Sequence, residues 1–180
     1  RQSAGAESSD QMAIGDAQAA AGDQAAARTA YEAMAEACRR NGDRSCEAQA
    51  QSLIAAVLVR TGDIEGATAL ERQAVQTEQE VGSKVNMAVR TLVVGFAYQD
   101  VNRYADAMER YKRAEALARD TANTYLQRIV ALDIGNLLRT QGLAKDSVPY
   151  LDAALASARK DGDVDTEVRS LISLGDTYSD

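Results

Sequence analysis

Histidine is absent from this sequence of 180 residues, and its absence limits the chemistry that the chain can perform. Histidine is the commonest general base, a frequent metal ligand and the usual partner of a nucleophilic serine or cysteine. A catalytic cysteine without such a partner is unusual, and the sequence contains no glycine-rich phosphate-binding loop. We therefore expect a protein that is not an enzyme and that uses no metal and no cofactor.

The two cysteines, Cys38 and Cys46, lie four residues to either side of a turn at Gly42. In an antiparallel hairpin this spacing can bring their Cβ atoms face to face, which allows a disulfide in an oxidising compartment. The other interpretation is two small buried hydrophobic side chains between helices. Because two cysteines are too few for a disulfide framework, we favour the second interpretation and a cytoplasmic protein, with a periplasmic location as the alternative if the disulfide forms.

Residues 161–167, with the sequence DGDVDTE, resemble the start of a calcium-binding loop. Such a loop also needs glycine at its sixth position and glutamate at its twelfth. These positions hold Thr166 and Ile172. The segment is better explained as an acidic turn followed by a helix N-terminus, where the helix dipole favours carboxylates.

The composition indicates an all-α fold. Hydrophobic residues make up 46% of the chain but aromatic residues only 4%, so the core must consist mainly of alanine, leucine, valine and isoleucine in closely packed elements. The single proline also favours long helices, because proline removes a backbone donor and clashes within a helix. The chain begins at Arg1 rather than methionine and has far more arginine than lysine, so we expect a processed or excised piece of a bacterial protein.

The net charge of −7 bears on the partners of the chain. An acidic chain lacks the attraction to phosphate that nucleic-acid binding uses, and anionic membrane surfaces repel it. No apolar run approaches the roughly 20 residues that span a bilayer. We expect protein or peptide partners, and neither nucleic acid nor membrane.

Turn-forming residues recur with a period of 40 residues, and the segments between them show the 3.6-residue hydrophobic period of helices. One set of turns is Gly22-Asp23, Gly62-Asp63, Asn102-Arg103 and Gly142-Leu143, and a second set falls midway, near residues 42, 82, 121 and 162. We predict helices over 5–21, 24–40, 44–60, 64–80, 84–101, 104–120, 123–141, 144–160 and 164–179. Short turns make neighbouring helices antiparallel. The chain is thus predicted to be one array, 1–180, of about four and a half hairpins (5–40, 44–80, 84–120, 123–160 and 164–180), with residues 1–4 frayed.

Small residues occupy one phase of the first helix in each unit: Gly15, Ala55, Gly95, Gly135 and Gly175. The second helices carry a small residue at Ala27, Ala67, Ala107 and Ser147, then Tyr31, Glu71, Tyr111 and Leu151 four residues later, then Met34, Ala74, Ala114 and Ala154. This pattern resembles the tetratricopeptide repeat (TPR), whose small residues let two helices cross closely while an aromatic side chain fills the space beside them. The usual TPR period is 34 residues, and the 40-residue form resembles repeats of kinesin light chains and bacterial regulators. Because Glu71 replaces the aromatic residue, we expect the second unit to pack more loosely.

The TPR resemblance implies a right-handed α-solenoid of about nine helices, with the first helix of each hairpin lining a concave face. In that family the concave positions lie three residues before the small residue and one, four and five residues after it. The candidate partner-binding residues are Arg60, Leu92, Phe96, Gln99, Leu132, Asn136 and Arg139. The two arginines could hold an acidic group, and Asn136 could pair with the backbone of an extended peptide. An ordinary solvated face is the alternative for each of these residues.

Two functions agree with these features. The first is a protein–protein interaction scaffold that binds a peptide or protein segment in the concave groove, for which charge reversal at Arg60 and Arg139 is expected to abolish binding. The alternative is a ligand-sensing or regulatory segment of a larger bacterial signalling or transcription-regulatory protein. The last helix also carries an apolar stripe of Val168, Leu171, Ile172 and Leu174 without a following hairpin partner. We expect this stripe to meet a continuation of the chain or a second copy, as in a homodimer.

Overall fold

The computed structural model describes residues 4–179, and this part of the chain folds as an unbroken row of α-helices. The helices are α1 (Ala4–Ala20), α2 (Gln24–Arg40), α3 (Arg44–Thr61), α4 (Ile64–Val81), α5 (Lys84–Asp100), α6 (Tyr104–Arg119), α7 (Thr124–Thr140), α8 (Ala144–Asp161) and α9 (Val164–Ser179). The predicted all-α repeat is confirmed, and each helix bound lies within one residue of its prediction. The predicted fraying of residues 1–4 lies mostly outside the described residues, and Ala4 already belongs to α1.

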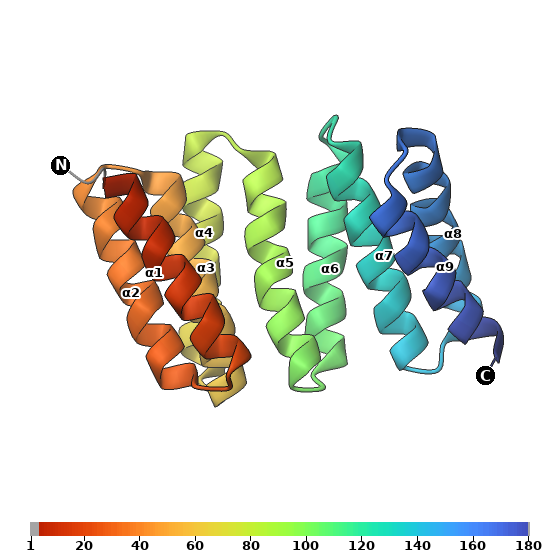
Figure 1. The fold of residues 1–180 in the computed structure, drawn as a ribbon, viewed down its shortest axis with the longest axis horizontal. Coiled ribbons are helices and arrows are strands. Elements are labelled where there is room, and N and C mark those ends of the chain that lie inside the picture. Colours follow the sequence, from red (N-terminus) through yellow and green to blue (C-terminus); the bar gives the residue numbers. More distant parts are fainter. Residues whose placement is uncertain (1–3, 180) are drawn as a thin grey trace.

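The helices form antiparallel hairpins that stand side by side, from α1–α2 at one end to α7–α8 at the other (Figure 1). Helix α9 follows as the first helix of a fifth unit and packs on α8 and α7. The described N- and C-terminal parts of the chain therefore lie at opposite ends of the row (Figure 1). In the described part of the chain, no helix combines the length and the apolar character that crossing a bilayer requires.

The crossing within a hairpin depends on the small residue of its first helix. A Cβ atom added to Gly95 would lie 2.7 Å from the Tyr111 ring, and one added to Gly135 would lie 2.6 Å from Leu151. Ordinary carbon contacts need at least about 3.5 Å, so a side chain at these glycines would push the second helix away. The packing that this close approach allows offsets the roughly 1 kcal/mol that a mid-helix glycine costs relative to alanine.

The second unit is not packed more loosely, contrary to the expectation drawn from Glu71. The Glu71 side chain is as deeply buried as the aromatic Tyr31. Its carboxylate accepts hydrogen bonds from the guanidinium of Arg110 in the next unit, at 3.3 Å, and that guanidinium also lies 4.6 Å from the centre of the Tyr98 ring. An ion pair that reaches across two units thus replaces the missing aromatic ring.

Cys38 and Cys46 form a disulfide, so the favoured interpretation of two free thiols was wrong. The turn between α2 and α3 brings the two Cα atoms to 5.5 Å, a separation typical of disulfides. This turn is fixed by Asp43, whose side chain accepts a hydrogen bond from the backbone N–H of Cys46 at 2.9 Å. The side chain that caps the start of α3 therefore also positions Cys46 beside the end of α2.

Candidate partner-binding groove

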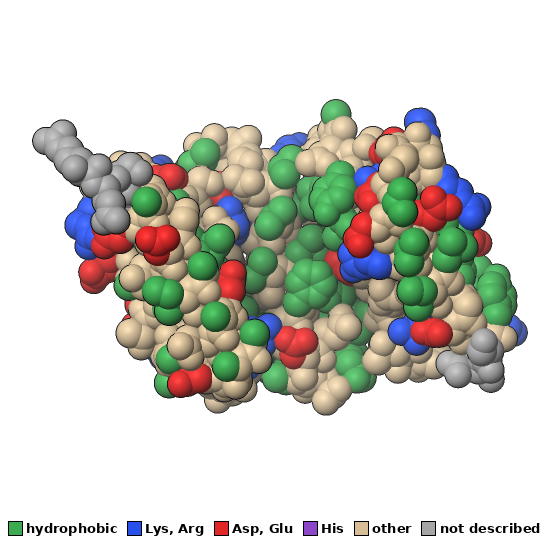
Figure 2. Space-filling model, in the orientation of Figure 1, with side chains coloured by type: hydrophobic (Ala, Val, Ile, Leu, Met, Phe, Trp, Pro, Cys, Tyr) green, Lys and Arg blue, Asp and Glu red, His purple; other side chains and the backbone are tan. Residues whose placement is uncertain are grey.

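The first helices of the units line a hollow in the middle of the molecule, which Figure 2 shows between the end formed by α1 and the end formed by α9. Hydrophobic side chains cover much of its floor (Figure 2). A pocket of about 250 Å³ opens here. Its lining residues come mainly from α1, α3 and α5: Asp16, Ala19, Tyr31, Leu53, Ala56, Arg60, Val93 and Phe96.

Two aromatic side chains line this pocket, and of these Phe96 is 38% exposed whereas Tyr31 is buried. The ring of Phe96 meets the ring of Tyr111 edge to face, with centroids 5.5 Å apart. The hydroxyl of Tyr111 is buried and donates a hydrogen bond to Oε1 of Gln99 at 2.8 Å. Burial raises the pKa of Tyr111 far above that of a free tyrosine, and nearby carboxylates add to this. Tyr111 therefore stays neutral and holds both Phe96 and Gln99 in place.

The predicted residues are not equally accessible. Phe96 and Arg60 line the pocket together, whereas Leu92 and Leu132 lie in the hydrophobic core, 5% and 0% exposed. Successive residues of a helix are rotated by about 100° around its axis. The position three before the small residue therefore lies about 60° around the helix from the small residue and points toward the crossing. The position two before it lies about 160° away and points to the opposite side. Leu53 and Val93 occupy that second position and line the pocket instead.

The open line of the groove therefore runs through the positions two before, one after and five after the small residue. The corresponding residue of α7 at the first of these positions is Asp133, which is not among the candidate residues predicted from the repeat. Comparing residues one period apart in neighbouring units would have found it, because Leu53, Val93 and Asp133 are spaced by 40.

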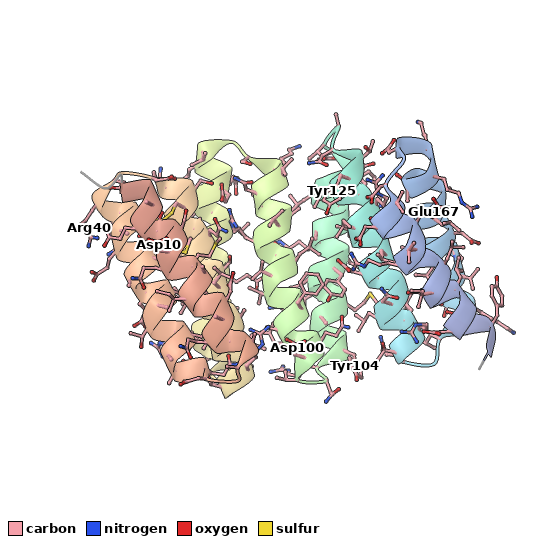
Figure 3. The ribbon with its side chains drawn as sticks, in the orientation of Figure 1. Asp10, Arg40, Asp100, Tyr104, Tyr125 and Glu167 are labelled. Carbon is pink, nitrogen blue, oxygen red and sulfur yellow. A yellow bond between two sulfur atoms is a disulfide. The ribbon has the colours of Figure 1, made fainter. Side chains whose placement is uncertain are left out.

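The two predicted arginines already have partners within the chain. The guanidinium of Arg60 donates hydrogen bonds to Asp100 at 2.8 and 3.1 Å, and Asp100 is labelled at the end of α5 in Figure 3. Arg139 lies 3.6 Å from Asp176 of α9. An acidic ligand would have to compete with these carboxylates, so the groove is not an open cationic site.

Asp133 is the most unusual polar residue of the groove. It is 6% exposed, and its Oδ2 has no hydrogen-bond partner among the described residues. Burial raises the pKa of its carboxyl to about 7, with Arg169 of α9 opposing the shift. One helical turn further along α7, Oδ1 of Asn136 is also buried without a partner.

The sequence matches no protein-family model and no curated protein. Solved structures do match. A Podosopora anserina putative kinesin light chain with nearly identical TPR-like repeats is 15% identical, with 94% of this chain and 84% of that chain covered and a TM-score of 0.65. BtubC (BKLC) from P. vanneervenii is 14% identical, with 99% and 84% covered and a TM-score of 0.62. The chain has a TPR-like repeat fold.

The acidic segment 161–167 serves the packing of this TPR-like array. The guanidinium of Arg128 lies 2.8 Å from Asp161 and 2.9 Å from Asp163. Asp163 also accepts a hydrogen bond from the backbone N–H of Thr166 at the start of α9. That backbone bond, with the other bonds to Asp163, lowers the pKa of its carboxyl, and the bond from Arg128 lowers the pKa of Asp161. These contacts confirm an acidic turn followed by a helix N-terminus, and residues 4–179 contain no group of three or more acidic or cysteine side chains placed to hold a metal.

Proposed function

We propose that this chain is a protein–protein interaction scaffold that performs no catalysis and binds an extended segment of a partner in its concave groove. The observation that carries the proposal is Phe96, a large aromatic side chain that is exposed within a pocket rather than on a convex surface. Aromatic side chains in pockets are common energetic anchors of interfaces, because they bury a large area at a small cost in side-chain entropy.

The neighbouring positions support an extended ligand. A segment that crosses the first helices would meet apolar Leu53 and Val93, then Phe96, then the polar pair Asp133 and Asn136. The first three would contribute hydrophobic burial. The last two offer hydrogen-bond acceptors that the chain itself leaves unused.

Replacing the aromatic anchor tests this proposal more cleanly than reversing the charge of Arg60 and Arg139, because charge reversal would also place carboxylates against Asp100 and Asp176. A partner captured from extracts of the source organism is purified, and its affinity is measured by isothermal titration calorimetry. We expect Phe96→Ser to weaken binding by about 2 kcal/mol or more, as for an interface anchor.

The matched control is Leu143→Ser, which alters a hydrophobic residue of similar exposure in the turn before α8, outside the pocket. Thermal melts confirm that both variants are folded. Equal affinities for the two variants would remove the groove from the proposed function.

The disulfide between Cys38 and Cys46 supports an oxidising compartment, the second of the two locations expected from the sequence. Alkylation of protein from its source cells without reductant, followed by mass spectrometry, tests this. An unmodified cysteine pair supports it, and a doubly alkylated one contradicts it.

Self-association through α9 stays a prediction. Val168, Leu171 and Ile172 are exposed on this helix, whereas Leu174 belongs to the core with Leu132 and Leu151 and does not extend the stripe. Sedimentation velocity at rising concentration tests it, with Leu171→Ser as the variant expected to shift the chain toward monomer.

A further inference from the structure

Asp133 occupies a groove position that the two preceding units fill with apolar side chains, whereas the following unit has the uncharged Ser173 there. The equivalents of Asp133 one and two periods earlier are Val93 and Leu53, both of which line the pocket. Removing a carboxylate from water without giving it a partner is costly. The chain nevertheless buries the carboxylate of Asp133 with Oδ2 unpaired. The equivalent helices α3 and α5 have no carboxylate at this position.

The surroundings of Asp133 combine unused acceptors with an aromatic surface. Asn136, one turn away on the same helix, also has a buried side-chain oxygen without a partner. The carboxylate of Asp133 lies close enough to Tyr111 to raise the pKa of the Tyr111 hydroxyl. The Tyr111 ring in turn packs edge to face against the exposed ring of Phe96. Two acceptors without a partner therefore lie one turn apart on α7, and Asp133 is close to the ring against which Phe96 packs.

We propose that this part of the groove, between α5, α7 and α9, binds the guanidinium group of an arginine side chain of the partner, with Asp133 as its counter-charge and Asn136 as a second acceptor. The inference rests on the proposed function, since it names what the partner places in the same groove. It shares Phe96 with the pocket formed mainly by α1, α3 and α5, but it uses none of the other residues that line that pocket.

Arginine fits these features better than lysine does. Its guanidinium is planar and presents five donors in a fixed arrangement, so that it can bond to two acceptors and lie against an aromatic ring at the same time. The ammonium of lysine is a compact and strongly hydrated charge that satisfies this combination less well.

Arg169 is the competitor that the chain itself supplies. This arginine of α9 acts on Asp133 electrostatically, but it makes no hydrogen bond to it. Its side chain is 47% exposed and lies 3.8 Å from Asp165 on its own helix. Arg169 therefore offsets the charge of Asp133 only in part and provides no hydrogen bond to its carboxyl group.

The test is a titration of the whole chain, labelled with ¹⁵N, with N-acetylarginine amide at about pH 8, where the carboxyl of Asp133 is ionised. N-acetylcitrulline amide is the matched probe, because it has nearly the same shape and carries no charge. We expect roughly millimolar binding, with amide shifts around Phe96, Asp133 and Asn136 that citrulline does not reproduce.

Two variants assign the binding to Asp133. Asp133→Asn keeps the shape of the side chain and is expected to weaken binding of the arginine probe about tenfold, as for the loss of a charged hydrogen bond. Arg169→Gln removes the competing cation and is expected to strengthen binding. If the site instead bound anions through Arg169, acetate would bind and Arg169→Gln would weaken that binding, whereas the arginine probe would cause no shifts. That result would overturn the inference.

Equal shifts with arginine and citrulline, or binding that Asp133→Asn leaves unchanged, would overturn the inference. Neither result touches the proposed function, which Phe96→Ser tests with the purified partner. Conversely, a partner that binds Phe96→Ser as well as the original chain would contradict the proposed groove even if the arginine probe bound at Asp133.

Discussion

Equivalent residues at the junctions between successive hairpins form very different interactions. At the α2–α3 junction, Cys38 and Cys46 form a disulfide. One period later, at the α4–α5 junction, the equivalent residues are Glu78 and Asn86. Glu78 is fully buried, accepts hydrogen bonds from Ser45 and Asn86 at 2.9 to 3.1 Å, and pairs with Arg90 at 3.1 Å.

A third solution appears at the α6–α7 junction, where Ala118, Leu126 and Val130 stand at the positions of Glu78, Asn86 and Arg90. All three are buried. The repeat therefore fixes where two helices meet, while a covalent bond, a buried ion pair or plain apolar packing can each hold them there. Moving residues between equivalent positions tests how far these solutions can replace one another.

The largest effect is expected from removing Glu78 alone. Glu78→Ala leaves the guanidinium of Arg90 buried with its carboxylate partner lost, which typically costs about 3 to 5 kcal/mol of unfolding free energy. Urea unfolding followed by circular dichroism measures the loss. A loss below about 1 kcal/mol would show that water or another group readily replaces the carboxylate.

The control copies the α6–α7 junction. The triple variant Glu78→Ala, Asn86→Leu, Arg90→Val carries the residues of that junction, and we expect it to recover most of the stability that Glu78→Ala loses, because apolar packing often equals a buried ion pair. A triple variant as unstable as the single one would mean that the α4–α5 geometry itself requires the polar network.

Breaking the disulfide is expected to have the next largest effect. The bond joins residues eight apart in sequence, and closing so short a loop in the unfolded chain corresponds to about 2.5 kcal/mol in the chain-entropy model. The variant Cys38→Ala, Cys46→Ala is compared with the original chain by urea unfolding. Reductant should lower the stability of the original chain to that of the variant and leave the variant unchanged; a response of the variant itself would point to an effect elsewhere.

The local features of the fold were predictable from sequence, whereas the contacts between units were less so. Turn residues such as Gly62 and Asp63 act within a few residues of themselves, and Asp63 indeed caps α4 through the N–H of Gly66. The disulfide was misjudged because the pairing of two thiols depends on how α2 meets α3, which the spacing alone does not fix.

The candidate groove was predictable only in part for the same reason. Phe96 was found because its phase follows from the repeat, but Leu132 was selected and Asp133 missed because a rotation of one residue decides which side chain faces the crossing. The pair of Arg60 and Asp100 was within reach, since these residues lie 40 apart and stand on neighbouring first helices.

A smaller effect of opposite sign is expected at Asp133. Asp133→Val installs the side chain found at the equivalent Val93 and removes an unpaired buried carboxyl, so we expect a gain of about 1.5 kcal/mol at about pH 8. The pKa of the Asp133 carboxyl is raised to about 7 in the folded chain, so this carboxyl binds its proton more tightly in the folded than in the unfolded state. The original chain therefore loses stability as the pH rises from the ordinary aspartate range through about 7.

The pH dependence separates the loss of charge from a change in packing. Arg169 of α9 acts on the Asp133 carboxyl, and Tyr111 of α6 faces it but remains neutral in this range. The gain from Asp133→Val should therefore be large at about pH 8 and should shrink or vanish at about pH 4. A gain that is independent of pH would mean that the pKa of Asp133 is the same in the folded and the unfolded chain, so that burial of its charge does not lower the stability.

The smallest effect concerns the caps of the second helices. Asp23 and Asp63 cap α2 and α4 through side-chain bonds at 2.9 Å, whereas Leu143, at the same position before α8, provides no such bond. Leu143→Asn supplies a cap of the kind that Asn123 gives α7 and adds no charge beside Asp146. Because Leu143 is exposed and little packing is lost, we expect a gain of about 0.5 to 1 kcal/mol.

The reverse substitution, Asp63→Ala, should cost a similar amount, and the two values are compared in the same urea unfolding assay. If Asp63→Ala destabilises the chain but Leu143→Asn does not stabilise it, the backbone before α8 does not present its amides as the earlier turns do. Leu143 has ψ of 56°, against 77° at Asp63, so this comparison measures how much a rotation of about 20° weakens a cap. Equal and opposite effects would show that the turns before α4 and α8 present their backbone amides to a capping side chain in the same way.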